Sequence, residues 1–161
     1  MDATTRQLSD IDWIPASGFQ LRKAGARFDA VRVDADDGRR LADMLEALCG
    51  GEPGPVVSEA NGRRGMYFLL PPGSTAHRSW PPGVQRFNSA RNTVSYVPVP
   101  ALSGRTWPLS WYFPPTARDR FVHPLLLLNA SIALLSEPPG RDVLETIGFR
   151  LSTLDVHDRD S

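Results

Sequence analysis

The sequence predicts an α+β domain, a mainly antiparallel sheet covered by helices. Three observations support this fold class: a strand pattern that passes directly into an amphipathic helix, two later segments typical of β-hairpins, and apolar helix patterns toward the end of the chain. With 161 residues, of which 41% are hydrophobic and 22% charged, the chain can build one core. We expect a single domain over residues 1–161, with residues 1–10 and 155–161 as flexible tails because both are polar and lack periodicity.

The first elements of this domain are a core-packed segment, a strand and a helix. Residues 11–24 carry aromatic and aliphatic side chains interrupted by proline and glycine, which indicates an irregular segment or a short helix. Residues 28–33 form the expected strand, and Gly50-Gly51 ends the helix that follows it. The apolar residues of that helix recur at helical spacing: Leu41, Met44, Leu45 and Leu48.

Two pairs of strands are expected in the middle of the chain. Residues 55–59 and 65–70 flank the turn signal Asn61-Gly62, a pattern typical of a hairpin. Residues 84–87 and 93–99 flank a second turn, so we predict that these two strands also pair with each other.

The remaining elements are one strand and two helices. Residues 107–113 are expected to form a strand bordered by prolines, which favours an edge position because proline cannot donate a hydrogen bond to a neighbouring strand. Residues 122–136 are expected to form a helix with Pro124 in its first turn, apolar on nearly all sides and therefore buried or in an interface. Residues 141–154 show a further helix-like period.

Three acids lie where the first strand meets the first helix, at Asp34, Asp36 and Asp37. Acids at this point can cap the helix N-terminus and interact favourably with its dipole. They can equally hold a divalent cation, because side chains two residues apart on a strand face the same way. Both roles are compatible with the sequence.

The formal net charge is zero, but the charges are segregated along the chain. From Ala60 to Arg118 there is no Asp or Glu, although arginines recur throughout this window. Because guanidinium groups suit phosphate recognition, the window predicts contacts to nucleic acid or nucleotide phosphates; a solvated basic face is the alternative. The candidates for phosphate binding are Arg63, Arg64, Arg78, Arg86 and Arg91.

Aromatic side chains share this acid-free window. Aromatics that stack on bases, beside arginines that hold phosphates, are the usual pattern for binding single-stranded nucleic acid. The candidates for base stacking are Tyr67, Trp80 and Tyr96. The alternative is that half or more of these aromatics are core residues, since strands favour them.

Composition disfavours several classes of protein. No run approaches the roughly 18 apolar residues that span a bilayer, and the polar N-terminus has no signal-peptide core, so we expect a cytoplasmic protein without membrane contact. Cys49 is the single cysteine, which excludes an intrachain disulfide and a cysteine-based zinc site. The histidines His77, His123 and His157 lack metal-ligand spacing.

Several segments occur in an order and spacing known from one family. They are Val31-Arg-Val-Asp-Ala-Asp36, Gly54-Pro-Val-Val, Asn61-Gly-Arg-Arg-Gly-Met-Tyr-Phe-Leu-Leu-Pro-Pro-Gly73, Gly83-Val-Gln-Arg-Phe and Val94-Ser-Tyr-Val-Pro-Val-Pro100. Over residues 28–115 the chain thus resembles the N-terminal domain of bifunctional DNA primase/polymerases, the prim-pol domain of the archaeo-eukaryotic primase superfamily, and its small actinobacterial relatives. The resemblance implies the prim-pol, RRM-like half of the family's fold and a connection with DNA replication.

The resemblance also implies an active site with three parts. Asp34 and Asp36 match the family's Asp-x-Asp, the catalytic pair that binds divalent metals. The family's phosphate-contacting histidine falls at Gly65 or Met66, and its third acid falls near Gln85. Two of the three parts are therefore missing from this chain.

This pattern predicts a degenerate prim-pol-like domain without polymerase activity, because phosphoryl transfer needs several carboxylates around its metals. We expect it to bind nucleic acid or nucleotide phosphates through its arginines and aromatics. The first alternative is a non-enzymatic interaction or regulatory module that self-associates or holds a protein partner through residues 122–136. The second is a residual nucleotidyltransferase that uses Mg²⁺ or Mn²⁺. In a degenerate site Asp36 and Asp37 are expected to cap the helix, and Asp34 has no assigned role.

Overall fold

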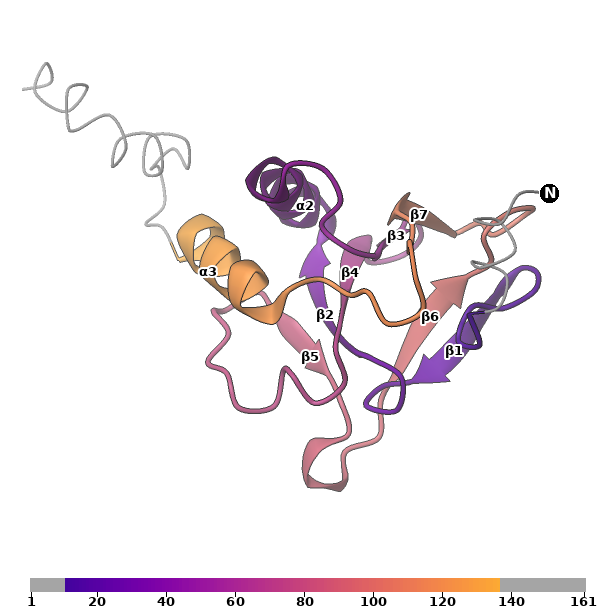
Figure 1. Ribbon diagram of the computed structural model, residues 1–161, viewed down its shortest axis with the longest axis horizontal. Helices are drawn as coiled ribbons and strands as arrows, with labels where there is room; N and C mark the ends of the chain where they lie inside the picture. The colour runs from indigo at the N-terminus through magenta and orange to yellow at the C-terminus, as the bar shows by residue number, and fades with distance from the viewer. Residues whose placement is uncertain (1–10, 137–161) are drawn as a thin grey trace, which may run out of the picture.

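The computed structural model describes residues 11–136, and an antiparallel five-stranded sheet forms its centre (Figure 1). The strand order across this sheet is β5-β2-β4-β3-β7. Its strands, in chain order, are β2 (Asp29–Asp34), β3 (Val56–Glu59), β4 (Gly65–Leu70), β5 (Gln85–Phe87) and β7 (Leu109–Phe113). A second, two-stranded antiparallel sheet pairs β1 (Phe19–Lys23) with β6 (Tyr96–Pro100).

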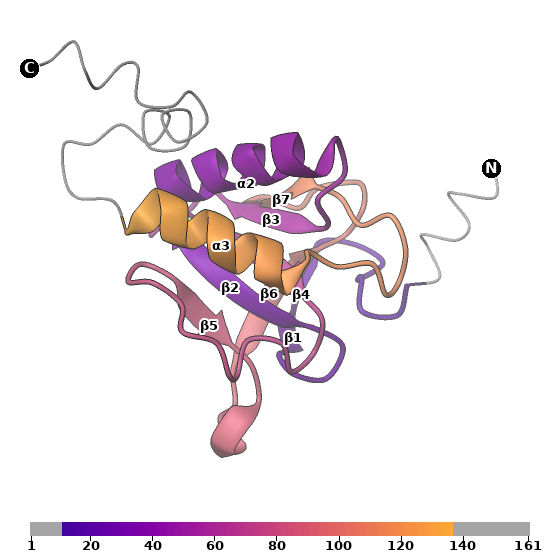
Figure 2. The same cartoon turned by 60° about the vertical axis from the view of Figure 1, so that its left-hand side comes forward.

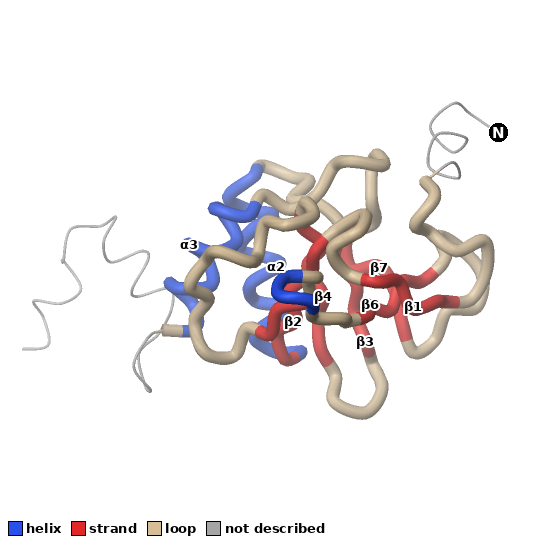
Figure 3. The backbone as a smooth tube through the Cα atoms, turned by 90° about the horizontal axis from the view of Figure 1, so that it is seen from below, coloured by secondary structure: helices blue, strands red, loops and turns tan. Residues whose placement is uncertain are grey.

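Two helices, α2 (Ala35–Cys49) and α3 (Pro124–Leu135), lie side by side over one face of the large sheet (Figures 1 and 2). Seen from below, the helices gather on one side of the strands (Figure 3). The helices and this face enclose one hydrophobic core, to which Val31 and Phe68 belong. A second core lies on the opposite face, where β6 contributes Val97. The predicted α+β class, a mainly antiparallel sheet packed with helices, is confirmed.

Strand β2 passes into α2 without an intervening loop, since the strand ends at Asp34 and the helix begins at Ala35. The helix ends at Cys49 and is capped by Gly50, whose φ of 74° is left-handed and whose backbone N–H donates to the carbonyl of Glu46. A residue with a Cβ is strained in that conformation, which is why glycine suits the end of the helix. The predicted strand, helix and stop signal are confirmed.

Strands β3 and β4 form the predicted hairpin across the Asn61-Gly62 turn. In its register Val57 lies opposite Tyr67, and Glu59 lies opposite Gly65. Strand β7 pairs with β3 and forms one edge of the sheet, the position that its flanking prolines predict.

Two expectations about the strands are wrong. Residues 19–23, within the segment predicted to be irregular or helical, form β1. Strands β5 and β6 do not pair with each other, because β5 pairs with β2 and β6 pairs with β1. Between them lies a short 3₁₀ helix, η1 (Ala90–Asn92), in which Arg91 and Asn92 have positive φ values of 53° and 61°. The chain thus leaves β5 through a helical turn and not through a tight hairpin turn.

Helix α3 confirms the helix predicted over residues 122–136. Nδ1 of His123 accepts hydrogen bonds from the backbone N–H groups of Leu125 at 3.2 Å and Leu126 at 3.4 Å, and Pro124 occupies the first turn. These contacts satisfy N–H groups that lack partners within the helix. One side of α3 is buried against the sheet, whereas Leu125 and Ile132 remain exposed.

The tails predicted at residues 1–10 and 155–161 and the helix predicted at residues 141–154 lie outside the described residues. Within residues 11–136, no helix has both the length and the apolar composition needed to cross a bilayer.

Candidate functional site

Strand β2 presents two charged side chains to the face that the helices do not cover. Val31 and Val33 pack into the core beneath the helices, so the alternating residues Arg32 and Asp34 point to the other side. The side chain of Arg32 is only 7% exposed, whereas that of Asp34 is 67% exposed. Arg32 is therefore buried in the protein, whereas Asp34 lies at its surface.

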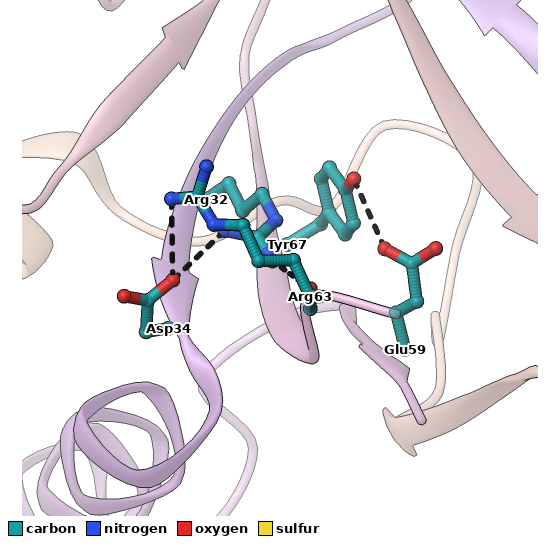
Figure 4. Close-up of polar contacts among 5 residues, drawn as sticks. All are labelled: Arg32, Asp34, Glu59, Arg63 and Tyr67. Carbon is teal, nitrogen blue, oxygen red and sulfur yellow. Dashed lines mark hydrogen bonds and ion pairs between the residues drawn. The ribbon is translucent and has the colours of Figure 1, made fainter. Parts of the chain in front are cut away.

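The guanidinium group of Arg32 links three parts of the sheet (Figure 4). Its Nη1 donates a hydrogen bond of 3.0 Å to Oδ1 of Asp34, and its Nη2 donates to the backbone carbonyl of Arg63 in the β3–β4 turn. Its Cζ lies 5.9 Å from the ring centre of Tyr67, within the range of a cation–π contact. Arg32 thus ties the turn and the end of β2 to the sheet.

Asp34 lies between two guanidinium groups. Nη2 of Arg63 is 3.5 Å from the same Oδ1 that accepts from Arg32 (Figure 4). The hydrogen bond from Arg32 and the positive charges of both arginines hold the pKa of Asp34 below its usual value, against an opposing effect of desolvation. The structure thus assigns Asp34 a role that the sequence leaves open: it is the charge partner of Arg32 and Arg63.

Gly65 provides the space that the Arg32 guanidinium occupies. A Cβ atom at this position would lie 2.5 Å from Cζ of Arg32, closer than such atoms approach in proteins. Because Arg32 is buried and hydrogen-bonded, it cannot move away without losing those contacts. A glycine directly opposite Asp34 on β4 is therefore part of the same arrangement.

Tyr67 belongs to the buried part of this cluster. Its hydroxyl donates a 3.3 Å hydrogen bond to Glu59, and its ring centre lies 5.6 Å from that of Phe87. Burial raises the pKa of Tyr67, and the negative charge of Glu59 raises this pKa further. Tyr67 is buried, with Arg32 and Phe87 both near its ring, so the ring offers no accessible face to a base.

Asp36 and Asp37 have different positions from those that the sequence suggests. Both lie in the first turn of α2, so Asp36 does not share a strand face with Asp34. The residue at the N-cap position is Asp34, and its side chain makes no capping hydrogen bond. The expectation that Asp36 and Asp37 cap the helix is therefore wrong, because α2 begins at Ala35, two residues earlier than a cap at Asp36 requires. Their charges still interact favourably with the helix dipole.

The donor atoms around Asp34 do not fit a two-metal centre. Its carboxylate already pairs with two guanidinium groups, and the nearby carboxylate of Glu59 accepts from Tyr67. Within the part of the chain that the structure describes, no three His, Cys, Asp or Glu side chains gather as a metal would require. The exposed guanidinium groups beside Asp34 suit a negatively charged ligand instead.

The three positions at which the resemblance implies catalytic groups lie on adjacent strands. Gln85 of β5 and Tyr67 of β4 flank Arg32 of β2, and Gly65 lies beside Asp34. Met66 instead packs in the core beneath the helices. This face therefore carries an amide at Gln85, the Arg32–Asp34 ion pair and a glycine at Gly65, where the resemblance implies a third acid, a metal-binding acid pair and a histidine.

The five candidate arginines do not form one surface. Arg63 and Arg64 are exposed in the β3–β4 turn, at the Asp34 end of β2. Arg86 is exposed on the edge strand β5, opposite Val31 and therefore on the face that the helices cover.

Arg78 and Arg91 lie at the opposite end of β2, about 17 Å along the strand. There Asp29 accepts hydrogen bonds from the backbone of residues 73–75, and Nε of Arg78 donates 2.8 Å to a carbonyl of the same loop. A cavity of about 390 Å³ opens beside this loop, and His77 and Arg91 contribute to its lining. Four of the five arginines thus form two separate groups, one at each end of β2, and Arg86 lies apart from both on β5.

Two stacking candidates remain, Trp80 and Tyr96. Trp80 is half-buried against the core beneath the helices, and its Nε1 donates to the carbonyl of Thr75 at 3.3 Å. Tyr96 is 50% exposed at the start of β6, opposite Lys23 of β1. Of the three candidates, Tyr96 is the one with an accessible ring.

Arg32 organises this site, yet the sequence prediction omits it. A signal for it exists, because Arg32 stands between Val31 and Val33 in a strand expected to pack on the core. A charged residue there requires hydrogen-bonding partners inside the protein.

Comparisons with models of protein families, with curated proteins and with solved structures found no match. The relation to prim-pol domains therefore stays a prediction from the order and spacing of the motifs. The chemistry of the site rests on its geometry and its charges.

Proposed function

We propose that the β3–β4 turn binds the phosphate groups of nucleic acid or nucleotides, on a prim-pol-like domain that does not polymerise nucleotides. The observation that carries this proposal is the hydrogen bond from the buried Arg32 to the backbone carbonyl of Arg63. It holds in place a turn with two exposed guanidinium groups, those of Arg63 and Arg64. The N–H donors of the turn are then held in position before a phosphate group binds, which reduces the entropy lost on binding.

The exposed guanidinium groups of the turn also suit an anion. They lie at the same end of the sheet as the carboxylates of Asp34, Glu59, Asp36 and Asp37, of which Asp34 pairs with Arg32 and Arg63. The Arg63 side chain is 79% exposed, so its remaining N–H groups can reach a phosphate oxygen. A guanidinium fork matches the geometry of a phosphate group.

Polymerase chemistry lacks its ligands at this site. Gln85 and Gly65 bring no negative charge for metal binding, and the carboxylate of Asp34 is already paired. Binding without catalysis is therefore the function that the geometry supports best. We propose a cytoplasmic location with it, where nucleic acid and nucleotides are available.

The test is fluorescence anisotropy with a labelled single-stranded oligonucleotide at several salt concentrations. Binding to phosphates should weaken as salt rises, because condensed counterions are released. Replacing both Arg63 and Arg64 by alanine should reduce the slope of log K against log salt by about 1.4, since each lost phosphate contact contributes about 0.7 on single strands.

Arg91→Ala is the matched control, because it removes the same charge at the far end of β2. It should leave the affinity nearly unchanged. The proposal is contradicted if the protein binds neither single- nor double-stranded DNA or RNA, if affinity does not respond to salt, or if Arg91→Ala weakens binding as much as the change at the turn.

A protein-interaction module is the second candidate. The outer face of the β1–β6 sheet favours it, since Phe19, Leu21 and Tyr96 are all exposed there. Exposed Leu125 and Ile132 on α3 add a second apolar surface. Light scattering coupled to gel filtration should then show self-association that Leu21→Glu or Ile132→Glu abolishes, and a monomer at every concentration contradicts the self-association form of this candidate.

A further inference from the structure

An apolar groove of about 610 Å³ lies between α2 and α3. Its lining includes Met44, Ala47 and Leu48 from α2, and Leu126, Ala130 and Ala133 from α3. Leu48 is 58% exposed, an unusual degree for a leucine beside so many apolar neighbours. Covering this surface would remove apolar area from water, which is favourable.

The two helices run in opposite directions along the groove (Figure 2). Helix α3 therefore ends beside the start of α2, and Leu134, its second-last residue, still lines the groove. The chain continues from that end of α3, so Ser136 leads out beside the apolar groove.

The sequence beyond α3 carries a pattern suited to this surface. Residues 137–161 lie outside the described residues. Glu137-Pro-Pro-Gly140 ends the preceding helix pattern, and a further helix period begins at Arg141. On a helix, Phe149 falls on one side and the aliphatic residues fall on the other: Val143, Leu144, Ile147, Leu151 and Leu154.

We propose that residues 141–154 form a helix that packs into the groove between α2 and α3, parallel to α2. The inference is independent of phosphate binding at the β3–β4 turn. The short link at residues 136–140 is typical of antiparallel helix pairs, so the segment can return directly along α3.

The dimensions of the segment and the groove agree. A helix over residues 141–154 is about 21 Å long, and α2, with its 15 residues, is about 22 Å long. In the parallel direction Leu151 comes level with Ala47, near the far end of the groove. The apolar stripe then spans the groove from one end to the other.

The charges and the connectivity also favour residues 141–154 over a second molecule of this protein as the segment that fills the groove. Asp142 and Glu145 lie in the first half of the segment, where the parallel direction brings them near Arg40 on the groove rim. A covalently linked segment also has an effective concentration in the millimolar range. A second molecule reaches that level only in concentrated solution.

Disulfide trapping in the full chain tests the proposal. In a Cys49→Ser background, Ala47→Cys is combined with Leu151→Cys, which lies on the apolar stripe, or with Phe149→Cys, which lies on the opposite side of the same helix. A disulfide needs Cα atoms within about 7 Å. The first pair should therefore form an intramolecular disulfide about tenfold faster than the second under mild oxidation.

Non-reducing gels with mass spectrometry distinguish the outcomes. A fast intramolecular bond in the Leu151→Cys pair alone supports the proposal. Equal rates in the two pairs, or no bond in either, overturn it, and a disulfide between two molecules assigns the groove to a second copy instead. Met44→Cys with Ile147→Cys provides an independent pair, and circular dichroism of the reduced variants checks that each is folded.

Discussion

Arg32 donates a hydrogen bond of 3.0 Å to Asp34, its second neighbour along β2, on the sheet face that the helices leave uncovered. The guanidinium of Arg32 is buried and the carboxylate of Asp34 is exposed, so a positive charge inside the protein is paired with a negative charge at its surface. In a metal-dependent active site the same space holds a cation among carboxylates. Here a side chain of the protein, Arg32, supplies the positive charge.

Replacing Arg32 by methionine should destabilise the protein by about 2 kcal/mol. The change keeps most of the packing but removes the donors to Asp34 and to the carbonyl of Arg63. A polar group left without a partner costs about 1–3 kcal/mol. Urea denaturation measures the loss, and Arg86→Met on the exposed edge of the sheet is the matched control, which should cost less than about 0.5 kcal/mol. Equal losses in the two variants would contradict a structural role for Arg32.

Gly65→Ala should destabilise the protein because the added methyl group would collide with the Arg32 guanidinium. The added Cβ would lie 2.5 Å from Cζ of Arg32, so the side chain has to leave its partners. We expect a loss of about 1–2 kcal/mol in the natural sequence. The same change in an Arg32→Ala background should cost almost nothing, and the double-mutant cycle measures the coupling. Additive losses would show that something other than Arg32 occupies the space.

The ion pair should make stability depend on pH at the acidic end. The pKa of Asp34 is lowered by its hydrogen bond with Arg32, so the unfolded chain, with a pKa near 3.9 for this group, binds the proton more readily than the folded protein. The contribution of Asp34 is therefore complete above about pH 5 and is lost as pH falls below about 4.

Asp34→Asn isolates this contribution. The free energy of unfolding of the variant should lie below that of the natural protein near pH 6, and the difference should shrink as pH approaches 3. In an Arg32→Met background the same substitution should have a smaller effect, because the main cause of the pKa shift is gone. A difference that stays constant with pH would contradict the assignment.

Local patterns in the sequence predict much of this fold. The β2–α2 unit has a clear change from strand to helix spacing, and the β3–β4 hairpin has the turn signal Asn61-Gly62 between two apolar runs. The partners of β5 and β6 are not predicted, because both pair with strands far away in sequence. Nothing in residues 84–99 alone distinguishes a hairpin from two strands that separate into different sheets.

The candidate site is less predictable for a related reason. The spacing of Asp34 and Asp36 suggests a shared strand face only if the strand continues, whereas α2 begins at Ala35. Arg63 and Arg91 lie in one acid-free window, yet the antiparallel course of the strands brings them to opposite ends of β2. Sequence distance and charge content do not report which end of a sheet a turn occupies.

A thermal-shift experiment should distinguish an anion site from a metal site. Inorganic pyrophosphate at ten times its dissociation constant should stabilise the folded state by about 1.4 kcal/mol, since a ligand of the native state shifts the unfolding equilibrium by mass action. For a domain of this size the expected rise in Tm is about 3 °C or more. Millimolar Mn²⁺ or Mg²⁺ should leave Tm unchanged, because Asp34 is paired with two arginines.

Two double variants make this comparison decisive. Arg63→Ala with Arg64→Ala should abolish the effect of pyrophosphate, because these are the exposed guanidinium groups beside Asp34. Asp34→Asn with Asp36→Asn should not reduce the response to the anion, since both carboxylates repel it. A rise in Tm with Mn²⁺ that the aspartate variant removes would establish a metal site at the end of β2. In that event the ion would share the Asp34 carboxylate with Arg32 and Arg63, both of which contact its Oδ1.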